Sequence, residues 1–175
     1  EEEFYPLLEK VVLTAPKTAT RAFFNQLFGG RNEKAVLGEL LSVVLNNSMY
    51  TYKAAGVMIG VEKAIINNIL GILDWDPKVA GGTFAAGGSM TNFMSMLMAR
   101  DMVGKNVTTD GVQETMTVYT SKESHYSIPK NATFAGLGRD QVRYIETDDQ
   151  GRMLPDALEA AIKKDIQNGF LPVLI

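Results

Sequence analysis

The sequence predicts an α/β fold in which a mainly parallel sheet occupies the second half of the chain and a mostly helical segment precedes it. Helix and strand patterns alternate over residues 81–175, which favours parallel strands joined by helical crossovers. Apolar residues recur at helical spacing over residues 33–46 and 53–73, and no convincing strand pattern precedes them. We therefore expect a helical N-terminal segment over residues 1–80 and the first part of an α/β domain over residues 81–175.

The N-terminal segment contains two expected helices. Residues 1–20 show no strong period, whereas residues 33–46 carry a broad apolar stripe that ends at the polar run NNS. The longer helix over residues 53–73 ends before Pro77, because proline cannot continue a helix. Three glycines in this helix each weaken it by about 1 kcal/mol relative to alanine: Gly56, Gly60 and Gly71.

A glycine-rich loop leads into a helix-patterned run over residues 81–100. Ser89 suits the N-cap of that helix, because its hydroxyl can accept a hydrogen bond from a first-turn amide. The free amides and the positive end of the helix dipole would then form an anion site. The alternative is a plain tight turn, since the loop has neither Walker spacing nor a strict G-x-G-x-x-G. The loop glycines and apolar helix positions are Gly81, Gly82, Gly87, Gly88, Met90, Phe93, Met94, Leu97 and Met98.

The second half continues with three expected strands that are rich in β-branched and aromatic residues: 115–120, 141–145 and 170–175. One connecting helix is expected from Tyr126 or Ser127 to Leu137, and another from Pro155 to just before Gly169. Asp148 and Asp149 fall between them and are typical turn residues rather than a catalytic pair.

The composition is that of a globular domain without a nucleic-acid-binding surface. The chain has 175 residues, of which 46% are hydrophobic and 21% charged, and its formal net charge is −3 with no basic tract. It has no cysteine, which excludes disulfides and thiolate metal sites and fits a reducing compartment such as the cytoplasm. No apolar run approaches the roughly 18 to 20 residues of a membrane span. The chain starts without methionine and ends on the apolar run LPVLI, so we expect a fragment.

His125 is the only histidine and lies just past the carboxyl end of a predicted strand. Ligands of open α/β sheets bind beyond the carboxyl ends of the strands, so His125 and the glycine-rich loop are candidates for one crevice. The alternative is a surface or capping histidine. One histidine without cysteine argues against zinc but leaves carboxylate-only metal ligation open. No G-x-S-x-G motif is present, so the residues alone indicate an α/β domain that is a candidate for binding an anion.

Four separated stretches match one family pattern in order: FFNQLF (23–28), NNSMYTY (46–52), GTFAAGGSMTNFMSMLMAR (82–100) and TSKESHYSIPKNA (120–132). Several motifs with matching separations are far more specific than any one of them. On these motifs the sequence resembles the pyridoxal-phosphate-dependent group II amino-acid decarboxylases, in particular the glutamate and cysteine sulfinate branch. The resemblance implies the type I, aspartate aminotransferase-like fold, with residues 81–175 as the first part of the cofactor-binding large domain.

The resemblance also implies roles for single residues. Gly88 and Ser89 match positions that hold the phosphate of pyridoxal 5′-phosphate through backbone amides and a hydroxyl. His125 matches the histidine that stacks on the cofactor ring, and it is the expected catalytic residue. Gln26 matches a position that contacts the substrate in the glutamate enzymes. The family implies an intertwined homodimer with a small-molecule amino-acid substrate, and the composition indicates neither a nucleic-acid nor a membrane partner.

The implied reaction is α-decarboxylation of an acidic amino acid, such as aspartate, glutamate or cysteine sulfinate, with the cofactor as electron sink. The family's Schiff-base lysine, the aspartate that pairs with the ring nitrogen and the arginine that grips an acidic substrate are expected further along the chain. Neither Lys122 nor Lys130 takes the lysine's position. The isolated chain is therefore expected to bind the cofactor weakly at best and to show no turnover. Phe28 departs from the glutamate enzymes and matches the cysteine sulfinate branch, while Lys53 and Gly56 depart from the family's usual residues.

Three other interpretations stay open at this point. Another type I pyridoxal enzyme, such as an aminotransferase or a desulfurase, would share the fold but not the FFNQLF stretch. A phosphate-binding module without catalysis would explain the glycine-rich loop but not the SHY stretch at 124–126. A non-catalytic homologue would keep every motif seen here.

Overall fold

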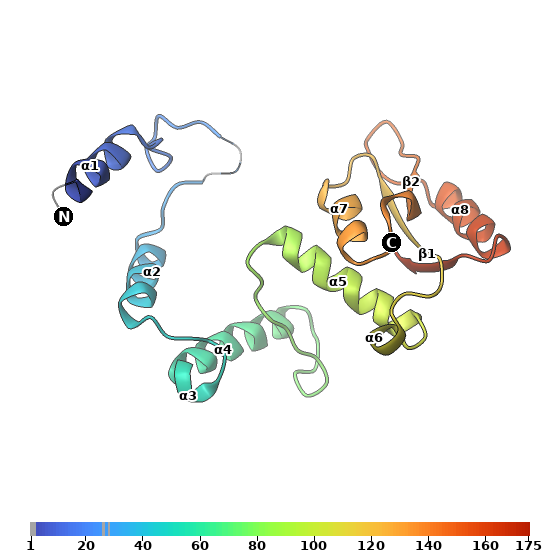
Figure 1. The fold of residues 1–175 in the computed structure, drawn as a ribbon, viewed down its shortest axis with the longest axis horizontal. Helices are drawn as coiled ribbons and strands as arrows, with labels where there is room; N and C mark the ends of the chain where they lie inside the picture. The colour runs from blue at the N-terminus through green and yellow to red at the C-terminus, as the bar shows by residue number, and fades with distance from the viewer. Residues whose placement is uncertain (1–2, 26, 28) are drawn as a thin grey trace. The chain divides into compact units, whose positions relative to one another are not determined.

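A computed structural model of the chain describes residues 3–25, 27 and 29–175. The chain divides into two compact units, Glu1–Gly81 and Gly82–Ile175. The described part of the first unit is made of helices and loops, and the second combines helices with a sheet (Figure 1).

The helices of the first unit are α1 (Phe4–Thr14), α2 (Glu33–Leu45), α3 (Tyr52–Ala55) and α4 (Val57–Ile72). The helix predicted over residues 33–46 is confirmed as α2. Asn32 caps its first turn, because the Asn32 side-chain oxygen accepts hydrogen bonds from the amides of Lys34 (3.0 Å) and Ala35 (3.3 Å). The helix ends where Asn46 adopts the left-handed conformation with φ 45°.

Two parts of the first unit differ from the sequence prediction. Helix α1 forms where no strong period was found, and Pro6 is tolerated there because it lies in the first turn, where amides have no intrahelical partner. The single helix predicted over residues 53–73 is interrupted at Gly56, with φ 55° and ψ −126°. Glycine adopts this conformation readily because it has no Cβ, so the chain turns between α3 and α4.

The first unit buries little of its apolar surface against itself. Among its described residues, only Ala55 and Leu70 are buried. Isolated helices of 11 to 13 residues are marginal in water, and the described part of this unit buries no residue of α1 or α2. Their exposed large apolar side chains are Phe4, Tyr5, Leu7, Leu8, Val11, Val12, Leu13, Val36, Leu37, Leu40, Leu41, Val43, Val44 and Leu45.

The second unit is built around a three-stranded parallel sheet with strand order β2-β1-β3. Its elements are α5 (Gly88–Val103), α6 (Val107–Asp110), β1 (Met116–Ser121), α7 (Ser127–Phe134), the 3₁₀ helix η1 (Arg139–Gln141), β2 (Val142–Ile145), α8 (Pro155–Gln167) and β3 (Leu171–Leu174). Val118 of β1 pairs with Val142 of β2, and Met116 of β1 pairs with Leu171 of β3. The predicted alternation of helices and parallel strands is therefore confirmed.

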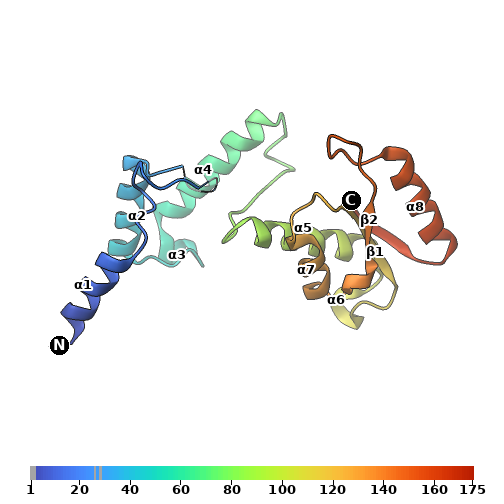
Figure 2. The ribbon, with the colours of Figure 1, turned by 90° about the horizontal axis from the view of Figure 1, so that it is seen from above.

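Helices cover both faces of this sheet. Met116 and Val118 point from β1 to one face, where they join Met96 of α5 and Ala132 of α7 in the core. Successive strand residues point to opposite faces, so Tyr119 points to the other face, where α8 lies (Figure 1). Figure 2 shows the same separation, with α5 and α7 on one side of the strands and α8 on the other.

A buried polar cluster joins α8 to the second face of the sheet. The Tyr119 hydroxyl donates to Asp165 of α8 (2.7 Å) and lies 2.9 Å from the Thr117 hydroxyl. Arg143 Nε of β2 donates to both oxygens of Asp165, at 3.1 and 2.9 Å. Burial raises the pKa of Tyr119, and Asp165 raises it further, against the lowering effects of Thr117 and Arg143. The cluster thus ties β1 and β2 to α8 through charge-assisted hydrogen bonds.

Some boundaries in the second unit differ from the prediction. Helix α7 ends at Phe134 rather than at Leu137, because Gly136 and Gly138 take positive φ values of 77° and 91° that turn the chain. The short helix α6 lies between α5 and β1, where no helix was predicted. These changes leave the strand order and the position of His125 after β1 unaffected.

Candidate functional site

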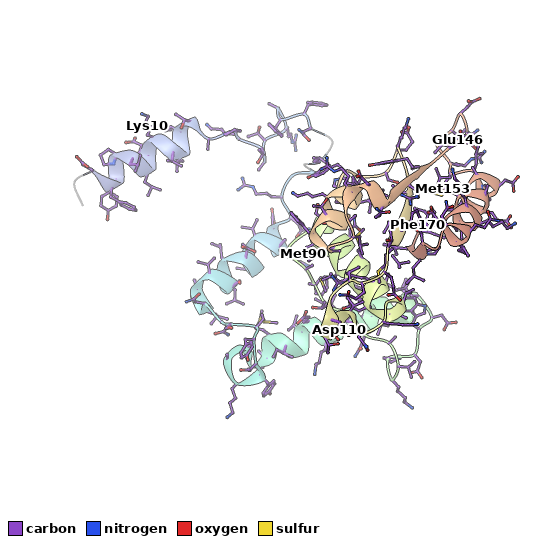
Figure 3. The ribbon with its side chains drawn as sticks, turned by 45° about the vertical axis from the view of Figure 1, so that its right-hand side comes forward. Lys10, Met90, Asp110, Glu146, Met153 and Phe170 are labelled. Atoms are coloured by element: carbon purple, nitrogen blue, oxygen red, sulfur yellow. The ribbon has the colours of Figure 1, made fainter. Side chains whose placement is uncertain are left out.

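The glycine-rich loop ends at Gly87, and α5 begins at the next residue. The Gly87 backbone is extended, and its carbonyl accepts hydrogen bonds from the amides of Met90 (2.9 Å) and Thr91 (3.1 Å). The N-cap role expected for Ser89 is therefore wrong, because Ser89 is the second residue of the helix and its hydroxyl caps no amide. Met90, labelled in Figure 3, marks this first turn. Since the cap is a glycine, no cap side chain covers the first-turn amides.

The first turn of α5 presents unpaired donors to solvent. Within the described residues, the amides of Gly88 and Ser89 and the Ser89 hydroxyl have no hydrogen-bond partner. Both residues are exposed, and a Cβ added at Gly87 or Gly88 would meet no atom within 4 Å. The positive end of the dipole of a 16-residue helix lies at the same point. Two amides and a hydroxyl in open space at a helix N-terminus form a donor set that suits a phosphate group.

Helix α7 holds this end of α5 through two partly buried hydrogen bonds. The side-chain amide of Asn131, which is 3% exposed, donates to the Ser89 carbonyl at 2.9 Å. One turn further along α5, the side-chain amide of Asn92 donates to the hydroxyl of Ser127 at 2.9 Å. Ser127 is the first residue of α7 and is fully buried. The two bonds therefore fix the position of the α5 N-terminus relative to the start of α7.

His125 lies in the loop that connects the carboxyl end of β1 to α7. Its Nδ1 lies 2.8 Å from the Ser127 hydroxyl and accepts a hydrogen bond from the Ser127 amide at 3.2 Å. The ring is exposed and lies beside Tyr126, with 4.3 Å between the ring centroids. Through Ser127, the histidine is connected to Asn92 and so to the first turns of α5.

An open cavity of about 230 Å³ lies at the carboxyl end of β1. It is lined by His125, by Thr120 and Lys122 from the end of β1 and its loop, and by Tyr144 of β2. This is the edge at which ligands bind in open parallel sheets. Lys122 and Lys130 are both exposed, and the Lys130 ammonium lies 5.7 Å from the centre of the Phe134 ring.

Three of the four predicted site residues, Gly88, Ser89 and His125, lie in segments that are hydrogen-bonded to α7. Asn131 contacts Ser89, next to Gly88, and Ser127 contacts His125. Gln26 lies outside the described residues, so its expected contact with the substrate stays a prediction. Phe28, which bears on the choice of substrate, also lies outside them.

Sequence reasoning missed the three residues that link the site together: Asn92, Ser127 and Asn131. Asn92 lies one turn before the buried Met96 on α5, and Asn131 lies next to the buried Ala132 on α7. An asparagine on the core-facing side of a helix is a usable signal, because a buried side-chain amide needs a hydrogen-bond partner. Ser127 carries no comparable signal, since a serine at a helix start is ordinarily a solvent-facing cap.

The acids of the turn after β2 belong to the turn and not to the site. The Asp148 carboxylate accepts hydrogen bonds from the amides of Gln150 and Arg152 at 2.9 Å each, and from Arg152 Nε at 2.7 Å. The hydrogen bonds from Arg152 hold the pKa of Asp148 below its usual value, with a smaller contribution from Gln150. Glu146 and Met153, labelled in Figure 3, lie at the two ends of this turn.

Residues 3–25, 27 and 29–175 contain no cluster of three histidine, cysteine or acidic residues that could hold a metal ion. Across the same residues, no helix is long and apolar enough to cross a membrane.

Comparison with known proteins identifies the family. Over residues 7–175, the chain matches the family model of the pyridoxal-dependent decarboxylase conserved domain. The chain belongs to this family. It is 33% identical to the acidic amino acid decarboxylase GADL1 of Xenopus tropicalis and 35% identical to the cysteine sulfinic acid decarboxylase of Mus musculus, each over 99% of this chain. Because it covers 34% and 35% of those proteins, the chain spans about a third of the length of the curated relatives it matches.

Solved structures agree with this assignment. The crystal structure of mouse CSAD is 35% identical and superposes with a TM-score of 0.90, covering 98% of this chain and 36% of that chain. The glutamate decarboxylase domain of a Vibrio parahaemolyticus diaminobutyrate-pyruvate transaminase and L-2,4-diaminobutyrate decarboxylase is 24% identical with a TM-score of 0.79, over 95% of this chain and 43% of that one. The predicted family and branch are confirmed by the family model and the relatives of 33% and 35% identity, and the fold class is confirmed by the solved structures.

Pyridoxal phosphate, the cofactor of the family, fits the chemistry of this site. The unpaired donors of Gly88 and Ser89 match a phosphate group, which offers only acceptors at neutral pH. The absence of a Cβ at Gly87 and Gly88 leaves room for close approach to the backbone. The exposed imidazole of His125, held at its Nδ1 edge by Ser127, can cover a flat ring.

Proposed function

We propose that the protein is a pyridoxal-phosphate-dependent decarboxylase that removes the α-carboxylate of an acidic amino acid. The observation that carries this proposal is the attachment of two functional groups to one helix. Helix α7 holds the first turn of α5, which carries the phosphate-type donors, through the hydrogen bond from Asn131 to the Ser89 carbonyl, and it holds His125 through Ser127. The printed names of the relatives, acidic amino acid decarboxylase and cysteine sulfinic acid decarboxylase, support the acidic substrate class. Aspartate, glutamate and cysteine sulfinate are the substrates to test.

In this proposal, the residues of the chain bind and orient. The amides of Gly88 and Ser89 and the Ser89 hydroxyl hold the cofactor phosphate, and the imidazole of His125 covers the cofactor ring. When bound, pyridoxal phosphate supplies an electron sink for the electron pair left by departing carbon dioxide. Gln26 contacts the substrate. Holding the cofactor at its phosphate and on one face of its ring, together with the contact from Gln26 to the substrate, orients the reactants and so lowers the entropic part of the barrier.

The proposal assigns different roles to two segments of the chain. Residues 81–175 form the first part of the cofactor-binding large domain, and residues 1–80 form a helical segment that precedes it. The family's Schiff-base lysine is assigned to a segment outside residues 1–175, since neither Lys122 nor Lys130 matches its position.

The test compares this chain alone with a longer protein in which the chain is continued. Cofactor binding is followed by pyridoxal absorbance, and turnover by carbon dioxide release from the three acidic substrates. The longer protein is expected to release carbon dioxide, and the chain alone to bind the cofactor weakly and release none. Robust release by the chain alone would contradict the assignment of the lysine. A longer protein that binds the cofactor without any release would instead support a non-catalytic homologue.

We also propose that the protein is a homodimer in which the exposed apolar helices α1 and α2 face a partner chain. These helices have no buried residue, and an exposed apolar surface of this extent is typical of an interface. Sedimentation equilibrium of the longer protein is expected to give the mass of two chains, and a monomer over the whole concentration range would contradict the proposal.

The lack of cysteine supports a cytoplasmic location, which cell fractionation tests.

A further inference from the structure

The imidazole of His125 is hydrogen-bonded through only one of its two nitrogens within the described residues. Nδ1 lies 2.8 Å from the Ser127 hydroxyl and 3.2 Å from the Ser127 amide nitrogen. Nε2 has no hydrogen-bond partner in the described part of the chain. The ring is therefore held at one edge and offers the other edge to a ligand.

The direction of the Ser127 amide bond decides where the ring proton lies. A backbone N–H only donates, so Nδ1 must accept, and an accepting Nδ1 carries no proton. In the neutral imidazole the proton then lies on Nε2. The backbone amide favours this tautomer by itself, and a hydrogen bond donated by the Ser127 hydroxyl would favour it further.

Asn92 sets the direction of the second bond to Nδ1. Its side-chain amide donates to the Ser127 oxygen at 2.9 Å, which leaves the Ser127 hydroxyl hydrogen free to point at Nδ1. Ser127 is fully buried, so its hydroxyl has to be satisfied by these two partners. Asn92 therefore donates a hydrogen bond to Ser127, and Ser127 donates one to His125.

We propose that Ser127 and Asn92 are positioning residues that hold His125 in the tautomer with its proton on Nε2. The exposed nitrogen of the ring is then a hydrogen-bond donor and not a base. A donor at this point suits an ionised carboxylate, which offers only acceptors. That consequence rests on the proposed decarboxylase function, whereas the tautomer itself can be measured without turnover.

The first experiment measures the tautomer directly. The protein is labelled with [¹⁵N]histidine, and the His125 signals are identified by their loss in His125→Gln. Long-range ¹H–¹⁵N spectra distinguish a protonated from an unprotonated ring nitrogen. Nε2 is expected to carry the proton and Nδ1 to carry none, and a proton on Nδ1 would overturn the proposal whatever reaction the protein performs.

Two variants test the positioning residues. Ser127→Ala removes the hydroxyl, and Asn92→Asp replaces the donor by a carboxylate that turns the Ser127 hydroxyl away from the ring. Both are expected to increase the fraction of the Nδ1–H tautomer. Ser95→Ala is the matched control, because its hydroxyl lies on the exposed side of α5 and bonds only the Thr91 carbonyl at 3.0 Å. Since Asn92 is half-buried, Asn92→Asp keeps the test usable if Ser127→Ala does not fold. An unchanged tautomer in the folded variants would remove both residues from this role.

Turnover of the longer, cofactor-loaded protein gives the second readout. Ser127→Ala is expected to lower kcat about tenfold, the scale of one lost hydrogen bond, with KM little changed. Ser127→Thr keeps the hydroxyl and is expected to restore both kcat and the tautomer. If the wild-type protein shows the Nε2–H tautomer but no decarboxylation, the proposed function fails and the tautomer assignment stands. If kcat falls equally in Ser127→Ala and Ser127→Thr, Ser127 acts through packing and the proposal fails.

Discussion

The two units of this chain use the same hydrophobic pattern with different results. In the first unit, the apolar stripe of α2 predicts a helix correctly, yet that helix has no buried residue, and only Ala55 and Leu70 are buried among the described residues of the unit. In the second unit, Met96 and Met116 are buried because a helix and a strand present apolar faces to each other. Periodicity therefore predicts an element, whereas burial requires a second surface that the local sequence does not specify.

The two units also differ in how well the positions of their candidate site residues are defined. The second unit holds Ser89 and His125 by hydrogen bonds from buried asparagine and serine side chains, so the positions of these groups are defined. The first unit contains the region of Gln26, where the expected substrate contact stays a prediction. A site is defined only where buried groups fix its members.

The largest expected effect is the loss of turnover on removal of His125 from the second unit. In the longer, cofactor-loaded protein, His125→Ala is expected to lower kcat/KM by about 100-fold or more, because a positioned donor and ring cover are lost together. The fold should remain, since the ring is exposed. Carbon dioxide release and circular dichroism measure the two properties. Lys163→Ala, on the exposed side of α8, is the control that should change neither, and an unchanged rate in His125→Ala would remove the histidine from the site.

Glycine-to-alanine changes compare the packing of the two units directly. A Cβ at Gly104 would lie 2.3 Å from Met116 Cε and 2.5 Å from Val107 Cγ2, so Gly104→Ala overpacks the second unit. The free energy of unfolding is expected to fall by about 1–3 kcal/mol, measured by urea denaturation. An unchanged value would mean that the Met116 side chain moves aside without cost.

Gly60→Ala is the matched change in the first unit. Gly60 lies at the end of the first turn of α4, and a Cβ added there would meet no atom within 4 Å. Alanine is expected to stabilise this helix by up to about 1 kcal/mol through its higher helix propensity, measured by the same denaturation. A loss of stability would instead show that another surface packs closely on α4 and would narrow the contrast between the units.

Tyr119→Phe tests the polar cluster on the second face of the sheet. Loss of the hydroxyl between Thr117 and Asp165 is expected to cost about 1 kcal/mol near neutral pH. Because the pKa of Tyr119 is raised above its ordinary 10.0, the folded state keeps the proton to higher pH than the unfolded chain. Stability from this group is thus present below pH 10 and lost as the pH rises through the folded-state value. Denaturation at increasing alkaline pH should show this decline in the wild type and a smaller one in Tyr119→Phe.

The smallest effect is expected for Asp148→Asn in the exposed turn. The pKa of Asp148 is lowered, so its contribution is present above its ordinary value of 3.8 and is lost as the pH falls through the folded-state value. In Asp148→Asn this contribution is absent at every pH, so the stability of the variant should fall slightly less on acidification than that of the wild type. The measurement is the free energy of unfolding as the pH is lowered. Asp149→Asn is the matched control, since Asp149 takes part in none of the turn's hydrogen bonds. A larger shift for Asp149→Asn would contradict this account of the turn.

Much of the fold could be predicted because the signals are local. Alternating helix and strand patterns predicted the parallel sheet of the second unit, and the motif around Gly88 and His125 predicted the family. Predictions failed where two local signals compete. Gly87 and Ser89 are both acceptable caps, and the structure uses the glycine. Gly56 was treated as a weak point in one helix, and its positive φ ends one helix and starts another.

By itself, the sequence determined most of the helices, the three strands and the family, because periodicity and motif spacing are properties of neighbouring residues. Only the tertiary structure decided the partners of the site residues. Asn92 and Ser127 are 35 positions apart, and Ser89 and Asn131 are 42 apart, so no local pattern connects them. These bonds form because α5 and α7 pack on the same face of the sheet, where the half-buried amide of Asn92 and the buried amide of Asn131 need acceptors.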